Sequence, residues 1–290
     1  MKNLTYGPIE LAPVAGFLGA EVLSGAHIGT LDPEVFVHLR QAWLDWKVLF
    51  FRNQHEVTTP DHIAFTRQFG GLEIHPFLPD NGYPEIVVLD TAGEAPARAE
   101  IWHTDVSFRE CPPDGSVLRG CVIPPHGGDT IWADMERAYE ILDDVTKELI
   151  ENRTATHSLR RTFGKRLTPA ELEDKLVEFP DQHHPIVRIH PDTGRPSLYV
   201  NRPFVTEIDE MDPDAGDRLL QQLLRFAENP TIQCRFRWQP GSFAMWDNRS
   251  TQHFASQDYG DEHRRMERVT LLGSNPFGPT DKRAKQLVHD

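Results

Sequence analysis

Short apolar runs that are rich in Val, Ile, Phe, Tyr and Trp recur along this chain. Turn-forming segments such as PPHGGD, HPDTGRP and QPGS lie between neighbouring runs, and their Gly, Pro and Asp residues are typical of tight turns. Many short strands separated in this way predict a mainly β protein, with an antiparallel sandwich or jelly roll and helices packed outside it. The predicted strands are 47–51, 85–89, 116–122, 129–133, 185–190, 197–200, 233–238, 242–247 and 266–273.

Helical periodicity is confined to a few segments that begin with helix start signals. Because the strands and helices do not alternate as βαβ units and no Gly-rich phosphate loop is present, the pattern excludes Rossmann and P-loop nucleotide-binding folds. The predicted helices are 31–43, capped by Thr30; 61–69, opened in the same way by Thr59 and Pro60; 213–227, with a stripe of leucines; and a weaker one that starts at Thr168 and Pro169.

The composition favours a single soluble domain over residues 1–290. No repeat or linker divides the chain, and 39% hydrophobic with 26% charged residues is ordinary for a globular protein. The net charge of −14 argues against a nucleic-acid partner, which needs a basic surface. No apolar run reaches the ~18 residues of a membrane span. Three widely spaced cysteines predict no disulfide framework, and we expect a cytoplasmic protein.

A His-x-Asp pair in the segment WHTDVSF is the first sign of chemistry. If this segment is a strand, His103 and Asp105 point to the same face and can take adjacent positions on one metal. A distant histidine would complete a 2-His-1-carboxylate face, which suits Fe(II) oxygen chemistry. The second His-x-Asp pair, His190 and Asp192, is followed by Thr-Gly and is predicted to form a turn in which Asp192 bonds the backbone.

Two further segments supply a candidate third ligand and candidate anion-binding groups. An apolar strand ends in the polar turn WDNRSTQH, which places His253 after it. In the following segment RRMERVT, a strand would put Arg264 and Arg268 on one face, with Arg265 and Glu267 on the solvent side. Two inward arginines require two anions or buried acids as partners.

Taken together, WHTDVSF, GGDTIWADM, WDNRSTQH and the Arg-rich strand resemble the taurine dioxygenase family of Fe(II)- and 2-oxoglutarate-dependent dioxygenases. The resemblance runs from KVLFFRNQ to LLGSNPFG and implies a double-stranded β-helix, or jelly roll, as the core. It implies that His103, Asp105 and His253 bind iron, and that Thr130 and Arg264 hold 2-oxoglutarate. The substrate residues that it implies are His75, Thr162, Phe163, Phe204 and Arg268.

The activity implied is hydroxylation of a small anionic substrate with O2 and 2-oxoglutarate. The expected substrate is taurine or a related sulfonate, which would release sulfite and an aldehyde. Three positions depart from those enzymes: Leu78 replaces a Tyr, Ala99 an Asn, and Thr162 a Ser. We therefore expect recognition of the anion to be retained, whereas these departures put contacts to taurine's amine in question, and a site that loses such partners can change its substrate. Alkyl sulfates and carboxylates remain alternative substrates, and the oligomeric state, dimer or tetramer, stays open.

Two other classes of protein share a jelly roll. A zinc hydrolase would need a site such as His-Glu-x-x-His, which the sequence lacks, and it would give no purpose to Arg264. A non-catalytic sugar-binding jelly roll would not account for the three potential metal ligands His103, Asp105 and His253.

Overall fold

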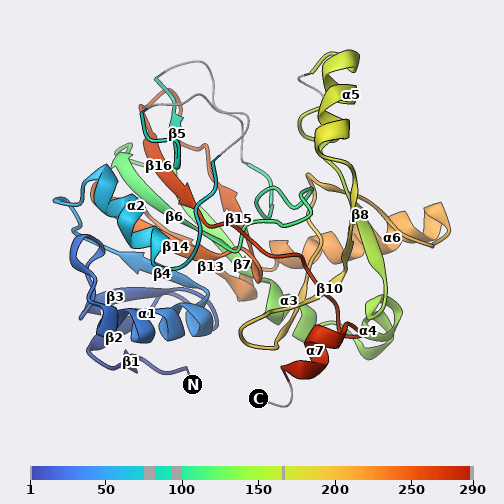
Figure 1. Cartoon of the computed structure of the whole chain (residues 1–290), viewed down its shortest axis with the longest axis horizontal. Helices are drawn as coiled ribbons and strands as arrows, with labels where there is room; N and C mark the ends of the chain where they lie inside the picture. Colours follow the sequence, from blue (N-terminus) through green and yellow to red (C-terminus); the bar gives the residue numbers. More distant parts are fainter. Residues whose placement is uncertain (1, 75–81, 93–99, 165–166, 288–290) are drawn as a thin grey trace.

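The computed structural model describes residues 2–74, 82–92, 100–164 and 167–287 and is mainly β with flanking helices (Figure 1). Its largest sheet has eight strands in the order β1-β2-β3-β4-β14-β6-β16-β5, with β3 and β4 parallel and the other neighbours antiparallel. These strands are β1 Thr5–Tyr6, β2 Ile9–Pro13, β3 Ala20–Ser24, β4 Val48–Phe51, β5 Ile86–Asp90, β6 Gly115–Val122, β14 Phe243–Asp247 and β16 Arg265–Thr270.

A second sheet of three antiparallel strands, β13-β7-β15, packs against the large one. Apolar side chains from both sheets form one buried cluster, in which Phe50 of β4 stacks on Phe236 of β13 with ring centroids 4.1 Å apart. Because two sheets share this core, the arrangement is a β-sandwich. The strands of the second sheet are β7 Thr130–Asp134, β13 Gln233–Phe236 and β15 Thr251–Ala255.

Two smaller strand groups extend the molecule beside the sandwich (Figure 1). One is the sheet β12-β8-β9 and the other is the hairpin β10-β11. Helix α6 packs on β12, where its leucines join a second buried core. The strands are β8 Thr154–His157, β9 Gln182–Pro185, β10 Val187–Ile189, β11 Pro196–Leu198 and β12 Val205–Ile208.

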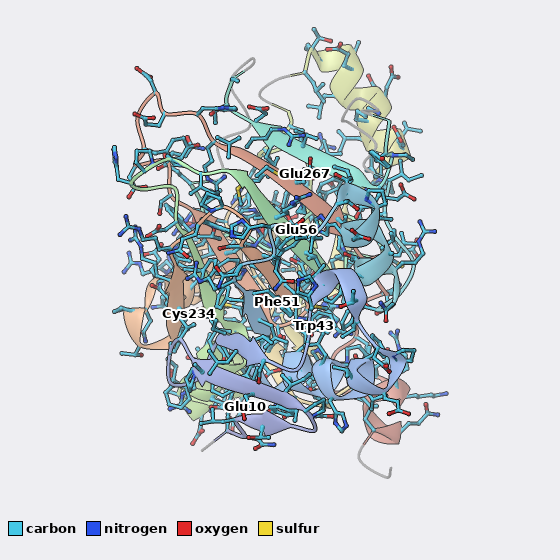
Figure 2. The ribbon with its side chains drawn as sticks, turned by 90° about the vertical axis from the view of Figure 1, so that its left-hand side faces the viewer. Glu10, Trp43, Phe51, Glu56, Cys234 and Glu267 are labelled. Atoms are coloured by element: carbon cyan, nitrogen blue, oxygen red, sulfur yellow. The ribbon has the colours of Figure 1, made fainter. Side chains whose placement is uncertain are left out.

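Helices cover the outside of the sheets. Trp43 of α1 and Phe51 of β4 belong to the core between that helix and the large sheet, and both are labelled in Figure 2. The helices are α1 Pro33–Trp46, α2 Thr59–Arg67, α3 Met135–Glu140, α4 Asp144–Ile150, α5 Pro169–Glu178, α6 Pro213–Leu224 and α7 Lys282–Gln286, with 3-10 turns η1 Ile28–Thr30, η2 Arg225–Glu228 and η3 Pro230–Ile232.

The structure confirms a mainly β protein with flanking helices and corrects several element boundaries. The first helix is capped by Asp32, whose side chain accepts from the backbone of Glu34, while Thr30 closes a 3-10 turn. The second helix is capped by Thr58 in a capping box, so Thr59 is already helical. The third ends at Leu224, and a 3-10 turn covers the rest of the predicted span. Thr168 caps the fourth helix as predicted.

Within the part of the chain that the structure describes, none of the helices has both the length and the apolar character needed to cross a bilayer.

Candidate metal centre and its arginines

Backbone pairing brings His103 and His253 side by side, although they are 150 positions apart in the sequence. The amide of His103 donates to the carbonyl of His253 (3.1 Å), and the amide of His253 donates back (2.8 Å). The imidazole centroids lie 4.0 Å apart. His253 belongs to β15, which the neighbouring β7 fixes through its pairing with Trp132. The sandwich therefore holds His253 directly, and it holds His103 through the backbone bridge between the two residues.

Asp105 completes the group, but not by the strand alternation that the sequence predicts. Only His103 forms a bridge, and residues 105–108 are a turn in which Val106 has φ of 38°. The side chain of Asn248 fixes the turn, because it accepts from the amide of Asp105 at 3.0 Å. One ligand atom from each of His103, Asp105 and His253 lies within 4.8 Å of the other two. The turn thus achieves the convergence that we expected from a strand.

The protonation of the group suits metal binding. Nδ1 of His103 donates to the carbonyl of Ile101 at 2.7 Å, so in the neutral ring Nε2 carries the lone pair, and Nε2 lies 3.9 Å from Asp105 Oδ1. Burial lowers the pKa of His103 and holds that of His253 well below its ordinary value. Both imidazoles are therefore neutral and able to donate electron pairs at neutral pH.

Asp105 stays ionised inside the protein. Burial by itself would raise its pKa, but the opposing effect of the Arg268 guanidinium holds the pKa of Asp105 at about 2. Arg268 Nη1 donates to Oδ1 at 2.9 Å, whereas Oδ2 is buried without a hydrogen-bond partner among the described residues. His253 Nδ1 is orphaned in the same way. Two neutral imidazoles, one carboxylate and two orphaned donor atoms fit a divalent metal of the Fe(II) type.

Arg264 is a buried cation without an ion-pair partner in the part of the chain that the structure describes. It is 8% exposed, its Nε has no hydrogen-bond partner, and none of the ion pairs among the described residues includes it. Its backbone is fixed at both ends by Thr91, and burial lowers its pKa. Because an unpaired charge is costly to bury, this guanidinium is suited to a bound anion.

Thr130 lies on the same sheet as His253. Thr130 pairs with Ala255 and Trp132 with His253, so all four side chains share one face of the β7–β15 pair. The Thr130 hydroxyl accepts from the indole of Trp238 at 2.9 Å and keeps its own proton to donate. This position is one pleat repeat from His253, on the side where Gly128 approaches Arg264.

An apolar wall adjoins the turn that carries Asp105. Phe204 is buried against Val106 and Phe108, and the rings of Phe163 and Phe108 lie 5.8 Å apart. The hydroxyl of Thr162 donates to the carbonyl of Pro203 at 3.0 Å, which ties the two aromatic segments together. Thr162, Phe163 and Phe204 are therefore gathered beside the turn that carries Asp105, whereas His75, Leu78 and Ala99 lie outside the described residues.

The strand that carries Arg268 departs from simple alternation. Arg264 precedes β16, and a register shift between Arg265 and Met266 marks a bulge in its pairing with β6. Glu267, labelled in Figure 2, does not face solvent as predicted. It is 6% exposed, and its carboxylate lies 2.8 Å from Arg265 and 3.7 Å from Arg119. These arginines compensate a carboxylate that the sequence pattern alone assigns to the surface.

His190 and Asp192 are not part of the metal-ligand group. His190 is buried and bonds Asp247 at 2.9 Å, and its Nδ1 accepts from the backbone of the turn. The prediction that the Asp192 side chain bonds the backbone is wrong. Its carboxylate instead forms ion pairs with Arg40 at 2.6 Å and Arg249 at 2.7 Å. His190 and Asp192 therefore belong to an ion-pair network at the end of β14, which also includes Asp247 and Arg249.

Two residues that the sequence did not single out shape the centre. Asn248 fixes the Asp105 turn, and its only signal is its place between an apolar strand and His253. Gly128 has φ of 69°, and a Cβ there would lie 3.1 Å from the Arg264 Nε. A side chain at this position would therefore strain the backbone and crowd the guanidinium.

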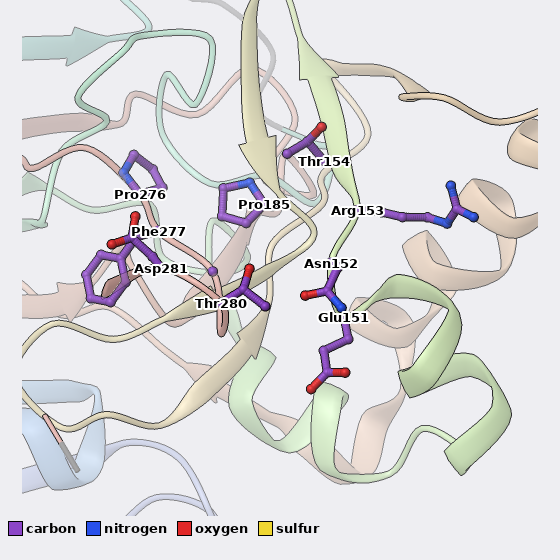
Figure 3. A pocket seen from close by; sticks show the side chains of 10 residues that line it. Glu151, Asn152, Arg153, Thr154, Pro185, Pro276, Phe277, Thr280 and Asp281 are labelled. Atoms are coloured by element: carbon purple, nitrogen blue, oxygen red, sulfur yellow. The ribbon is translucent and has the colours of Figure 1, made fainter. Parts of the chain in front are cut away.

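A surface pocket of about 280 Å³ lies elsewhere, between the β8–β9 strands and the C-terminal segment (Figure 3). Its lining includes Pro185, Phe277 and Asp281, and the side chain of Arg153 points away from these three in Figure 3. None of the predicted site residues lines it, so this pocket and the metal-ligand group are separate features.

We predict that His253→Ala and Asp105→Ala each weaken divalent metal binding more than about a hundred-fold, because loss of even an outer partner costs about ten- to a hundred-fold. Titration of the metal-free protein with Co(II), followed by its visible absorption, measures this. The matched control is His183→Ala, which removes an exposed imidazole on β9. Equal Co(II) affinity in His253→Ala and wild type would contradict the assignment.

We also predict that Asp192→Ala leaves Co(II) affinity within about two-fold of wild type but lowers the free energy of unfolding by about 1–3 kcal/mol, the usual contribution of a hydrogen bond to a charged group. Urea denaturation measures the stability. Asp261→Ala, at an exposed turn position, is the control and should stay within about 0.5 kcal/mol. A large loss of metal binding in Asp192→Ala would make this residue part of the centre.

Comparison with known proteins agrees with this geometry. Residues 10–270 match the family described as "Taurine catabolism dioxygenase TauD, TfdA family". The chain is 37% identical over 300 residues to an alkylsulfatase of Acinetobacter baylyi, covering 96% of this chain and 93% of that protein.

Two solved structures share the fold. A putative alpha-ketoglutarate-dependent taurine dioxygenase from Burkholderia xenovorans superposes with a TM-score of 0.81 at 35% identity, covering 93% of this chain and 95% of that one. The enzyme AAD-2, solved with Mn(II) and N-oxalylglycine, has a TM-score of 0.80 at 29% identity, covering 92% and 98%. The chain therefore belongs to the TauD, TfdA family and is a dioxygenase that depends on Fe(II) and 2-oxoglutarate.

Proposed function

We propose that His103, Asp105 and His253 hold Fe(II), and that the chain hydroxylates a small organosulfur anion at the carbon next to its sulfonate or sulfate ester group. The observation that carries the proposal is the convergence of these three donors within 4.8 Å of one another, in a protein that also buries Arg264 without an ion-pair partner among the described residues. Arg264 would take the distal carboxylate of 2-oxoglutarate in a bidentate fork, with the Thr130 hydroxyl as a second donor.

The iron, together with 2-oxoglutarate, supplies the activation of O2 that oxidises the substrate C–H bond, while 2-oxoglutarate becomes succinate and CO2. The task of the chain is placement. The guanidinium of Arg268 would bind the anionic head, and Phe163, Phe204 and Val106 would enclose the carbon chain and exclude water. His75 and Thr162 remain proposed substrate residues, although the hydroxyl of Thr162 already donates to Pro203.

Hydroxylation next to the sulfur group leads to release of that group. A sulfonate R–CH2–SO3⁻ becomes R–CH(OH)–SO3⁻, which collapses to an aldehyde and hydrogen sulfite. A sulfate ester R–CH2–OSO3⁻ becomes R–CH(OH)–OSO3⁻, which collapses to an aldehyde and hydrogen sulfate. The inorganic product therefore identifies the substrate class.

We favour an alkyl sulfate or a simple sulfonate over taurine. Leu78 and Ala99 stand where the taurine enzymes of the resemblance carry polar residues, and the 37% identical relative is named an alkylsulfatase. Glu73, the acid on the segment leading to His75, already has a cationic partner, because its carboxylate lies 2.8 Å from Arg109. Carboxylates are the second candidate class, because Arg268 would bind a carboxylate by the same fork.

For the fold we propose a double-stranded β-helix, in which the large sheet and β13-β7-β15 are its two faces. We further propose that residues 1–290 act as one catalytic domain in the cytoplasm. Residues 10–270 match one family model, and the metal-ligand group draws on the 103–105 segment and on β15. A homo-oligomer, dimer or tetramer, is the assembly we expect.

The test is a substrate panel with Fe(II), O2 and 2-oxoglutarate. We expect hexyl sulfate and hexanesulfonate to raise succinate formation at least about ten-fold above the substrate-free rate, with sulfate or sulfite released in equal amount. Taurine should be turned over more slowly. A panel in which only carboxylates stimulate succinate formation would overturn the organosulfur proposal.

Arg264→Lys is the companion variant. It keeps the charge and loses the planar fork, so we expect the KM for 2-oxoglutarate to rise about ten- to a hundred-fold with every substrate. Arg265→Lys, one residue along at a partly exposed position, is the matched control. An unchanged KM for 2-oxoglutarate in Arg264→Lys would remove that residue from the 2-oxoglutarate site.

A further inference from the structure

Arg268 forms an ion pair with Asp105, and it is also the residue proposed to bind the anionic head of the substrate. One guanidinium cannot bind both groups equally well at the same time. Its Nη1 lies 2.9 Å from Asp105 Oδ1, and both side chains are largely buried, with 15% and 8% exposed. Its Nε is buried without a hydrogen-bond partner, and among the described residues Asp105 is its one ion-pair partner. The guanidinium that would bind the substrate therefore rests on a proposed metal ligand.

The two partners differ in how firmly they are held. Asp105 is fixed at its backbone, where the amide donates to Asn248 and the neighbouring Thr104 hydroxyl donates to the carbonyl of Thr251. The Arg268 side chain has its single salt bridge and a long flexible stem. If the pair separates, the arginine is the group that moves.

The pair balances charge only while no metal is present. In this ion pair, the negative charge of the carboxylate and the positive charge of the guanidinium cancel each other. A divalent ion on Asp105, with metal–oxygen distances of about 2 Å, lies within roughly 5–7 Å of the guanidinium, where like charges in a buried site repel strongly. An anion bound to Arg268 would relieve that repulsion.

We propose that Arg268 couples the metal site to the substrate site: it neutralises Asp105 in the metal-free protein and transfers to the anionic head of the substrate when a divalent metal binds. This inference rests on the proposed function and adds a regulatory property to the same site. Because linkage is reciprocal, a bound anion must tighten metal binding by the same factor by which the metal tightens anion binding.

The measurement is Mn(II) affinity of the metal-free protein, read from the electron paramagnetic resonance signal of free Mn(II), without 2-oxoglutarate and without turnover. Methyl sulfate is the probe anion, and dimethyl sulfone is a neutral control of similar size. We expect saturating methyl sulfate to tighten Mn(II) binding about ten-fold in wild type, within the usual range of coupling between sites, and dimethyl sulfone to change nothing.

Three variants separate the coupling from a structural role. Arg268→Gln should bind Mn(II) about ten-fold more tightly than wild type without any anion and should lose the response to methyl sulfate. Arg265→Gln removes the same charge from the same strand and should behave as wild type. Arg268→Lys keeps the charge and should keep the response, which leaves the proposal testable if Arg268→Gln fails to fold.

The outcomes of these measurements also distinguish failure of the proposed coupling from failure of the proposed metal centre. Unchanged or weaker Mn(II) affinity in folded Arg268→Gln, or a response to methyl sulfate that persists there, would overturn the coupling while leaving the metal centre in place. Mn(II) binding that is absent from wild type, or that survives Asp105→Ala, would overturn the metal centre, and the coupling with it.

Discussion

The reciprocal backbone hydrogen bonds between His103 and His253 are the interaction on which the rest of the centre depends. They join a loop to the edge of the sheet β13-β7-β15, and they bring two imidazoles to a centroid distance of 4.0 Å. Asp105 reaches the same place because the turn after His103 is fixed by Asn248. The sandwich is therefore the rigid support that a preorganised metal site requires.

Charge balance is the second constraint on this centre. Among the described residues, Arg264 is buried without an ion-pair partner, and Arg268 forms one ion pair, with Asp105. Buried cations are costly unless they are paired, so the interior is arranged for anions that arrive from solution. Lys47 and Arg249 are buried as well, but both form ion pairs with acids of the chain.

The sequence predicted the strands at the centre of the sandwich and four of the helices, but it did not predict α3, α4 and α7 or the strands β1–β3, β8, β9, β12 and β15. It named the proposed ligands, but it did not predict the backbone that brings them together. His103, Asp105 and His253 could be named from motif order, because a 2-His-1-carboxylate set needs those residue types. Their convergence was predicted through a strand, whereas a turn with positive φ at Val106 produces it. Turn geometry of this kind depends on the distant Asn248, and local alternation carries no signal of it. The burial of Glu267 was missed for a similar reason, since Arg119 on a neighbouring strand helps to compensate it.

The central claim is that one divalent iron binds between His103, Asp105 and His253, and anomalous diffraction at the iron edge tests it most directly. Crystals grown anaerobically with Fe(II) and 2-oxoglutarate should show one strong anomalous peak about 2.0–2.2 Å from His103 Nε2, an Asp105 oxygen and a ring nitrogen of His253. A peak bound by other side chains, or no peak between these three at full iron loading, would contradict the account.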